Sequence, residues 1–227
     1  YPEHIKAIGG FEIDNKYVEN KLMVPEAVPE KYAKIAAMIQ KRYNLHVVKL
    51  TKKMVFDEGY GQKIFDLINA TYSHLYGYSQ LTQKQINQYI KMYLGMLDLE
   101  FVTLIEDWSG DERKLVGAGI SMPSLSIALQ KCHRGRMLPF GWWHLLRAIK
   151  FHKTKIVDLL LVGILPEYRA KGANALLFAD LIPIYQKYGI EWGETQVEME
   201  TNTAVQGQWG PLSPIQHKRR ECYIKKI

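Results

Sequence analysis

The stretch "LLLVGILPEYRAKGANALLFADLI", Leu159 to Ile182, contains the change of pattern that decides the fold. It begins as an uninterrupted apolar run, which predicts a buried strand from Ile156 to Leu165. After a proline and a glycine, apolar residues return at helical spacing, which predicts a helix from about Lys171 to Tyr188. Arg169 and Gly172 therefore lie where a buried strand gives way to a helix.

A junction of this kind is suited to binding an anion. The first turn of a helix carries unpaired N–H groups and a partial positive charge. Gly172 allows the backbone to bend and to approach a ligand closely, and Arg169 and Lys171 add full positive charge. A pyrophosphate group would fit there, although the GxGxxG and GxxxxGK[ST] phosphate loops are absent from this stretch. The alternative is an ordinary helix start with surface cations.

The composition predicts a globular, cytoplasmic protein. The chain has 227 residues, of which 47% are hydrophobic, enough for a sizeable core. No apolar run approaches the roughly 20 residues that span a bilayer, and no signal peptide is evident, so we expect no membrane partner. Cys132 and Cys222 have no CxxC spacing or neighbouring histidine cluster, which predicts free thiols and no metal site.

Positive charge is concentrated in one part of the sequence. The net charge is +7, and no acidic residue lies between Glu112 and Asp158. The cations of this basic block are Arg113, Lys114, Lys131, Arg134, Arg136, Arg147, Lys150, Lys153 and Lys155. They indicate an anionic partner or a solvated basic face, with nucleic acid as a weaker alternative.

Periodicity and turn signals predict a mixed α/β chain. Pro29 and Thr82 mark two helix starts. The expected elements are a helix (Glu30 to Tyr43), a strand (Leu45 to Leu50), two helices (Gly61 to Leu75 and Thr82 to Leu97), a β-hairpin (Glu100 to Met122), an insertion with helical segments (123 to 153), the strand and helix described above, a strand (Trp192 to Glu200), a short helix after Asn202 and a final strand (Lys218 to Lys226).

The junction resembles motif A of the GNAT superfamily of acyl-coenzyme A dependent acyltransferases. In that motif a strand ends near a proline, followed by Arg or Gln, two residues, Gly, one residue, and Gly or Ala. Pro166, Arg169 and Gly172 match this pattern, whereas Asn174 departs from the last small residue. The element order from Leu45 onward, the "METN" segment ending at Asn202 and the closing "RRECYIKK" strand are also similar to the family.

Three longer segments resemble a bacterial group of large, mostly uncharacterised GNAT-like proteins: "GISMPSLSIAL", "GRMLPFGWWHLLR" and "GILPEYRAKGANALL". The resemblance implies an α/β (α+β) GNAT fold, with a mixed central sheet and helices on both faces. It also implies acyl-coenzyme A, acetyl-CoA above all, as co-substrate, and an unknown amine as acceptor. The acceptor, the acyl length and the presence of a homodimer stay open.

The resemblance assigns roles to particular residues. The candidates for coenzyme binding are Gly163, Ile164, Leu165, Arg169, Ala170, Lys171, Gly172, Ala173, Asn174 and Asn202. A backbone N–H near Gly163, Ile164 or Leu165 would donate to the thioester carbonyl, and Asn202 would contact the pantetheine arm. We also expect cations between Lys131 and Lys155 to contact the 3′-phosphate of the coenzyme.

Acyl transfer also requires a base and an acid. In the predicted strand from Trp192 to Glu200, alternation places Glu194, Gln196, Glu198 and Glu200 on one face. Glu198 is the first candidate for the base and Glu200 the second; a solvated strand face is the alternative. The family often has a Tyr acid seven residues after the Asn, but Trp209 occupies that position, which leaves Tyr223 or solvent to protonate the thiolate.

The first residues resemble the end of a GNAT domain. "YPEHIKAIGGFEIDNKYVEN" has the helix, glycine, aromatic and strand order of such a tail. We therefore expect residues 1–28 to be the remnant of a preceding GNAT-like half, 29–44 a linker helix, and 45–227 the acyltransferase domain. An N-terminal helix and strand belonging to a single domain is the alternative.

Two other functions remain open from the sequence. One is a catalytically inactive GNAT-fold domain that binds coenzyme A or acts only in an interaction. In that case an acyl tunnel would be blocked by bulky side chains, for which Trp142, Trp143, Trp192 and Trp209 are candidates. The other is an RNA-associated relative, whose binding would weaken steeply with salt.

Overall fold

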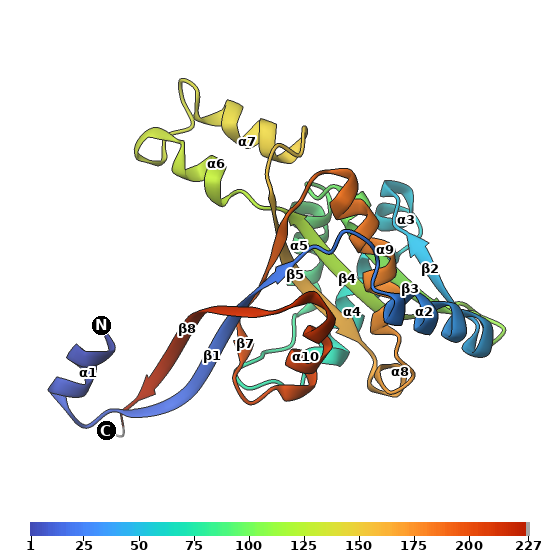
Figure 1. Ribbon diagram of the computed structural model, residues 1–227, viewed down its shortest axis with the longest axis horizontal. Helices are drawn as coiled ribbons and strands as arrows, with labels where there is room; N and C mark the ends of the chain where they lie inside the picture. The colour runs from blue at the N-terminus through green and yellow to red at the C-terminus, as the bar shows by residue number, and fades with distance from the viewer. Residues whose placement is uncertain (226–227) are drawn as a thin grey trace.

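An eight-stranded mixed sheet forms the centre of the protein (Figure 1). The computed structural model describes residues 1–225. The strand order is β2-β3-β4-β5-β6-β1-β7, and β8 pairs with β1. The strands are β1 (Glu12–Met23), β2 (Leu45–Lys49), β3 (Val102–Asp107), β4 (Lys114–Pro123), β5 (Ile156–Ile164), β6 (Trp192–Thr195), β7 (Glu198–Met199) and β8 (Ile215–Ile224). The pair β5 and β6 is parallel, and the other pairs are antiparallel.

Helices cover both faces of the sheet, as the sequence predicts. Successive residues of β3 point to opposite faces: Leu104 packs in a core with α4 (Tyr60–Tyr72) and α5 (Gln83–Tyr89), whereas Ile105 packs with α2 (Glu30–Tyr43) and α9 (Asn174–Lys187). Both side chains are fully buried. The α/β class with a mixed sheet is therefore confirmed.

Most of the predicted elements are confirmed within a few residues. Helix α2 has the expected bounds, and Thr82 caps α5 through a capping box with Gln85. A π-helical turn (Ile90–Leu94) continues α5, and a short helix α3 (Lys52–Phe56) precedes α4. The final strand starts at Ile215, earlier than expected, and Lys226 lies outside the described residues.

The junction between the buried strand and the following helix, around Arg169 and Gly172, differs in detail from the prediction. A short helix α8 (Pro166–Arg169) follows β5, and α9 begins only at Asn174. Gly172 lies between the two helices with φ 85°, a left-handed conformation that favours glycine. A Cβ atom on Gly172 would also lie 3.1 Å from Cγ2 of Ile35 in α2. The glycine therefore serves the turn and the packing of α2.

The predicted strand from Trp192 to Glu200 is wrong as a continuous strand. Strand β6 ends at Thr195, and β7 begins at Glu198 after a break at Gln196 and Val197. The regular alternation of the four polar residues is lost, because Lys21 pairs with Glu194 and Val18 with Glu198, so one extra residue between them switches the faces. Glu194 instead forms ion pairs with His217 and Lys218, away from Glu198.

Strand β1 lies inside the sheet rather than beside it. Lys21 pairs with Glu194 of β6, and Glu12 pairs with Ile224 at the far end of β8. The inner half of β1 is buried, from Val18 to Asn20 and at Leu22. The outer halves of β1 and β8 form a ribbon that extends away from the body and has α1 (Pro2–Ile8) at its end (Figure 1).

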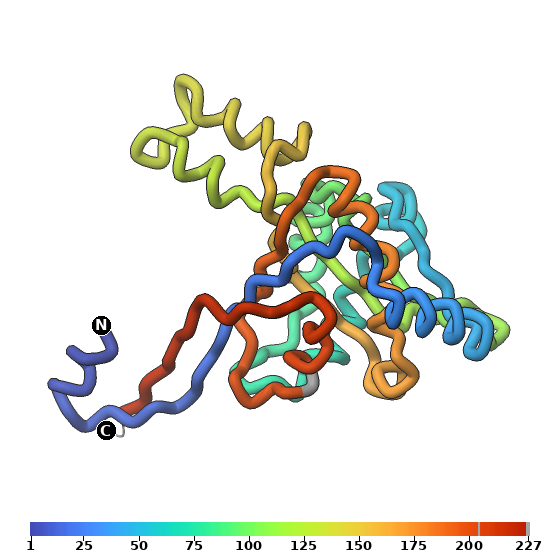
Figure 2. The backbone as a smooth tube through the Cα atoms, in the orientation of Figure 1, coloured from blue at the N-terminus to red at the C-terminus, as the bar shows by residue number. Residues whose placement is uncertain are grey.

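The predicted insertion is a pair of helices that extends from the body. Helices α6 (Ser126–Gln130) and α7 (Gly141–Ile149) lie side by side and connect β4 to β5, with a short 3-10 turn (His133–Gly135) between them (Figure 2). We refer to residues 124–155 as the projection. No helix of the described chain is both long and apolar enough to cross a membrane.

Candidate active site

A cleft opens where the two parallel strands part. Strands β5 and β6 pair from Ile156 and Trp192 to Leu159 and Thr195, and beyond this point the chain leaves β6 to pair with β1 as β7. The space between them has a volume of about 490 Å³. Its lining comes from β5, β6, β7, β1, the end of α4, the loop after α4, and α10 (Thr203–Gln208). Because the two strands part, the backbone groups of β5 beyond Leu159 have no strand partner on this side within residues 1–225. An extended ligand can bind to these groups.

Glu198 is the acidic residue of this cleft. Its carboxylate accepts hydrogen bonds from Trp209 Nε1, at 2.9 Å, and from Asn20 Nδ2, at 3.5 Å. Burial raises the pKa of Glu198 to about 7, and the hydrogen bonds from Trp209, Asn20 and Thr195 only partly offset this rise. A carboxylate with a pKa near neutral pH is matched to accept a proton from a substrate.

The raised pKa of Glu198 predicts that the stability of the protein depends on pH. A buried carboxyl that stays protonated up to about pH 7 in the folded state, and ionises near pH 4.5 when unfolded, lowers stability as pH rises between these values. The full pKa shift would correspond to a loss of about 3 kcal/mol in unfolding free energy. Because the side chain is partly exposed, we expect a loss of about 1 to 3 kcal/mol. Urea unfolding at pH 4.5, 6 and 7.5 measures this loss.

The matched variant is Glu198→Gln, which keeps a hydrogen-bond acceptor for Trp209 but does not titrate. We expect the difference in unfolding free energy between the variant and the wild type to shift in favour of the variant as pH rises from 4.5 to 7.5. A constant difference across this range would show that Glu198 ionises normally.

Tyr72 is a cleft residue that the sequence analysis missed. Its hydroxyl donates to the carbonyl oxygen of Val162, at 3.1 Å, and accepts from the N–H of Val162, at 3.3 Å. Both peptide groups of Val162 therefore face the cleft rather than β4. Burial raises the pKa of Tyr72, so its hydroxyl stays protonated at neutral pH. Only its position at the end of α4, opposite a strand far along the chain, distinguishes Tyr72 from the other tyrosines.

Strand β1 and the loop after α4 complete the cleft walls. Tyr17 lines the cleft, and Asn20 holds Glu198 from the same strand. The loop residues from His74 to Tyr78 also line it, and the hydroxyl of Tyr76 donates to Asp14 of β1. These residues carry no sequence motif, and their place follows only from the pairing of β1 with β6 and β8.

The anion-binding candidates adjoin the cleft at one end. Arg169 lines it, and its Nε donates to the carbonyl oxygen of Ile164 at 2.7 Å. Lys171 lies against an aromatic ring, with Nζ 4.3 Å from the centroid of Tyr168. The fourteen-residue helix α9 starts here without a side-chain cap, although the N–H groups of Gly172, Ala173, Ala175 and Leu176 donate to backbone carbonyl oxygens. Ala170 is exposed, while Ala173 is fully buried.

Comparisons with known proteins concern the fold of the chain. No protein-family model matches the chain. A GCN5-related N-acetyltransferase from Sphaerobacter thermophilus superposes with a TM-score of 0.59 at 9% identity, over 98% of this chain and 55% of that one. A tandem GNAT protein from the clavulanic acid biosynthesis pathway superposes with a TM-score of 0.50 at 13% identity, over 98% and 57% of the two chains. The chain has the GNAT fold.

A curated protein is also similar in sequence. A bacterial ceramide synthase from Caulobacter vibrioides is 22% identical over 175 residues, which cover 73% of this chain and 43% of that protein. The chain thus spans about half the length, or less, of this relative and of the two GNAT structures.

The structure brings some of the expected GNAT site residues together. Arg169, Glu198 and Asn202 all line the cleft, together with Trp209. Asn202 also caps α10, where its Oδ1 accepts from the N–H of Val205 at 3.4 Å. Of the four tryptophans considered as blocking groups, Trp209 lines the cleft, whereas Trp142 and Trp143 lie on the projection.

The other expected catalytic residues lie elsewhere. Glu200 forms an ion pair with Arg219 and is not among the residues that line the cleft. Tyr223 pairs with Ile13 on the outer ribbon and donates to Glu221, so this structure does not place it near a thiolate in the cleft. Both expectations depended on a regular strand from Trp192 to Glu200 and on a final strand beside the cleft.

The backbone N–H groups near Gly163, Ile164 and Leu165 were expected to donate to the thioester carbonyl. The N–H of Leu165 donates to the carbonyl oxygen of Val116, so it is occupied by the sheet. A Cβ atom on Gly163 would lie 2.9 Å from Oγ1 of Thr71, which shows that this glycine allows α4 to pack closely on β5. The peptide groups of Val162, one residue before these candidates, do face the cleft.

Most of the basic block lies away from the candidate anion-binding loop, although Lys114 pairs with Glu167 of α8. Its residues from Lys131 to Lys155 precede β5, whereas Arg169 follows it, so the nine residues of β5 separate them by about 30 Å. If the pyrophosphate binds beside Arg169, these residues are therefore too far away to contact the 3′-phosphate. Figure 1 shows the projection and α8 at opposite ends of β5.

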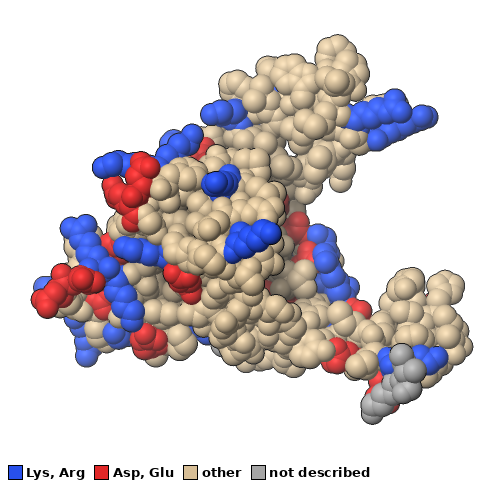
Figure 3. Space-filling model, turned by 180° about the vertical axis from the view of Figure 1, so that it is seen from behind, with Lys and Arg blue, Asp and Glu red and all other residues tan. Residues whose placement is uncertain are grey.

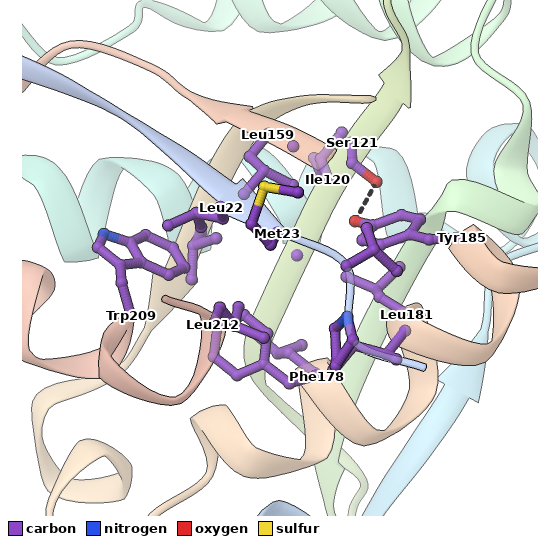
Figure 4. Close-up of a pocket in the computed structure, with 17 residues that line it drawn as sticks. Leu22, Met23, Ile120, Ser121, Leu159, Phe178, Leu181, Tyr185, Trp209 and Leu212 are labelled. Carbon is purple, nitrogen blue, oxygen red and sulfur yellow. Dashed lines mark hydrogen bonds between the residues drawn. The ribbon is translucent and has the colours of Figure 1, made fainter. Parts of the chain in front are cut away.

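A small apolar cavity lies on the other face of the sheet, towards α9 (Figure 4). It shares Leu159, Val162 and Trp209 with the cleft, and its volume is about 30 Å³, enough for only a few atoms. Tyr185 closes one side through a hydrogen bond of 2.9 Å to Ser121. As the side chains stand, this cavity does not extend the cleft for a long acyl chain.

Residues 1–225 contain no group of three or more His, Cys, Asp or Glu side chains that could hold a metal ion. Neither cysteine forms a disulfide: Cys132 is buried within the projection, and Cys222 is exposed on β8. The groups in the cleft that can take part in proton transfer are the carboxylate of Glu198, the imidazole of His74 and the hydroxyls of Tyr17, Tyr72, Tyr76 and Tyr78.

Proposed function

We propose that the chain is an acyl-coenzyme A dependent N-acyltransferase that transfers the acyl group directly to an amine. The observation that carries this proposal is the buried carboxylate of Glu198, with a pKa near 7, in the cleft between β5 and β7. The neighbours of the same fold are N-acetyltransferases by name, and ceramide, in the name of the curated relative, is an amide. Both support transfer to nitrogen.

The residues present fit coenzyme A. The pyrophosphate would bind at the start of α9, between Arg169 and Asn174, where the positive charge of Arg169 and Lys171 and the positive end of the helix dipole coincide. The pantetheine arm would lie along β5 in the cleft. Its amide groups would replace the Tyr72 hydroxyl at the peptide of Val162 and reach Asn202 on the opposite wall.

Direct transfer assigns one step to each group. Glu198 accepts a proton from the ammonium form of the acceptor, either directly or through a water molecule, and frees the lone pair for attack on the thioester carbon. A backbone N–H of β5 stabilises the negative charge on the carbonyl oxygen. The C–S bond then breaks, the Tyr72 hydroxyl gives its proton to the thiolate, and Tyr72 takes back the second proton that the product nitrogen loses as the amide forms. The acyl group in this proposal is acetyl, because the cavity behind Trp209 is small.

The place of β1 supports a tandem arrangement. We keep residues 1–28 as the end of a preceding GNAT-like half, 29–44 as a linker helix and 45–227 as the acyltransferase domain. Strand β1 contributes Asn20 and Tyr17 to the cleft of the following domain. In this proposal one half of the protein completes the active site of the other.

Coenzyme A binding tests the proposed role of the loop from Arg169 to Asn174. We expect Arg169→Glu to weaken coenzyme A binding by about tenfold or more, because a cation beside the pyrophosphate is replaced by an anion. Isothermal titration with coenzyme A measures the change. The matched control is Lys84→Glu, the same kind of charge reversal on the exposed face of α5.

Several outcomes would change the proposal. Equal affinity of both variants would place the coenzyme elsewhere. Tight binding of acetyl-CoA without release of free thiol, across a panel of amines, would favour an inactive binding domain. Binding of RNA that weakens steeply with salt and does not compete with coenzyme A would favour the RNA-associated alternative.

A further inference from the structure

The projection has its large apolar side chains on the outside. Small residues fill the contact between α6 and α7: Ala128, Cys132, Gly141 and Ala148 are all buried. A Cβ atom on Gly141 would lie 2.2 Å from the carbonyl oxygen of Arg136 and 3.2 Å from Sγ of Cys132, which shows how closely the connection packs on the start of α7. A helix pair that folded only for its own stability would bury its leucines and tryptophans in this contact.

The exposed apolar groups form one continuous part of the chain. Leu138 is 76% exposed and Phe140 is 73% exposed, in the connection between the two helices. Other large apolar residues exposed on the projection are Ile127, Leu129, Met137, Trp142, Trp143 and Phe151. The projection extends from the body, so the connection lies far from the main core (Figure 1). Such a concentration of exposed apolar groups indicates a binding surface.

The charge of the projection has a single sign. Its cations are Lys131, Arg134, Arg136, Arg147, Lys150, Lys153 and Lys155, and it contains no Asp or Glu. Figure 3 shows blue groups beside the tan surface of the projection and no red ones on the face in view. Among the ion pairs of residues 1–225, Lys155 is the one cation of this set with a partner, Glu191.

Some of these cations surround a pocket between the helices. The pocket has a volume of about 100 Å³, and its lining includes Lys131, Arg147 and Lys153. His144, Ser124 and Thr154 add further groups that can donate hydrogen bonds. Three cations and two hydroxyls around a space of this size suit one phosphate group.

We propose that the projection docks on the surface of an anionic phospholipid bilayer. Leu138, Phe140 and the two tryptophans enter the boundary between headgroups and acyl chains, and the cations contact lipid phosphates. One phosphate occupies the pocket between Lys131, Arg147 and Lys153. Apolar residues at the tip and cations around them complement the two layers of an anionic membrane surface.

This partner fits the observations better than nucleic acid or protein does. A nucleic-acid surface would use the cations but would leave Leu138 and Phe140 without an apolar contact. The proposal concerns binding at the surface, which needs no spanning helix, and it replaces the sequence-based expectation of no membrane partner. It does not depend on the proposed acyl transfer.

Vesicle flotation tests the proposal with the full chain. We expect the protein to float with vesicles that contain phosphatidylglycerol and phosphatidylcholine, and to stay in the dense fraction with phosphatidylcholine alone. Raising the salt concentration should weaken binding, because part of the attraction is between exposed charges. Equal recovery with both vesicle types, or no flotation with either, would overturn the proposal.

Two variants test the two parts of the surface. Leu138→Asp should lower the partition coefficient about tenfold or more, because an apolar side chain in the interface becomes charged. Its matched control is Met96→Asp, a similarly exposed apolar residue, 69% exposed, outside the projection. The pair Arg147→Glu and Lys153→Glu should weaken binding by a similar factor, and the pair Lys52→Glu and Lys84→Glu should weaken it less.

Circular dichroism and coenzyme A titration verify that each variant is folded. Flotation of Leu138→Asp equal to that of the wild type would overturn the proposal. So would sedimentation of the wild type as a dimer that Leu138→Asp converts to a monomer, because the surface would then serve self-association. Inhibition of flotation by short RNA but not by soluble phosphatidylglycerol headgroup would assign the cations to nucleic acid.

Discussion

Replacing Glu198 with Gln is expected to lower the rate of acyl transfer by about 10²- to 10⁴-fold, the usual contribution of a general base. Gln accepts the hydrogen bond from Trp209, so the cleft keeps its shape, but it cannot take a proton from the acceptor. Because the carboxylate must be ionised to act, the wild-type rate should rise with pH up to about 7 and then level. This rise should be absent in the variant.

Release of free thiol from acetyl-CoA in the presence of an amine panel measures the rate, and titration with coenzyme A measures binding. Glu200→Gln is the matched control, because Glu200 is on the same segment but pairs with Arg219. An unchanged pH profile in Glu198→Gln, or an equal loss in both variants, would remove Glu198 as the base. A loss of coenzyme affinity equal to the loss of rate would indicate a structural effect.

Removing residues 1–23 is expected to abolish the folded state. The deletion takes out β1, a strand with partners on both edges, so β7 and β8 lose their pairing partner and β6 keeps only β5. It also removes buried apolar side chains at Val18 and Leu22. The truncated chain should show no cooperative thermal transition and should aggregate through the open edges. A monodisperse, equally stable truncated protein would contradict the central position of β1.

A point variant measures the same contribution on a folded protein. Leu22 is 2% exposed and packs with Tyr32, Phe178 and Trp209, so Leu22→Ala should cost about 2 to 5 kcal/mol of unfolding free energy. The matched control is Ile13→Ala on the outer ribbon, where the side chain is 40% exposed and the cost should be below that of Leu22→Ala. Urea denaturation compares the two.

Local patterns determined most of the fold. The apolar run before Arg169, the helical spacing after it and the cap at Thr82 are short-range signals, and each corresponds to an element in the structure. The broken strand after Thr195 could not be predicted, because its pattern alternates regularly and only an extra residue in its pairing with β1 interrupts it. Propensity and alternation describe one strand at a time, whereas the sheet depends on partners far along the chain.

Only part of the candidate site could be predicted from the sequence, for the same reason. Arg169 and Asn202 follow from sequence motifs, and Glu198 from the need for a carboxylate near them. Tyr72 and Asn20 come from distant segments that carry no motif, and three-dimensional pairing alone brings them to the cleft. Tyr223 failed as a candidate because the strand that carries it continues past the cleft into the outer ribbon.

The position of β1 has a consequence for synthesis of the protein. Its residues are translated before its partners on β6 and β8, which include Glu194 and Ile224 and follow about 10 to 40 s later. Throughout this interval both edges of the strand lack their partners. Contacts of such long sequence separation also form slowly. The surroundings of Glu198, including Asn20, are therefore assembled only after β6 and β7 have been translated.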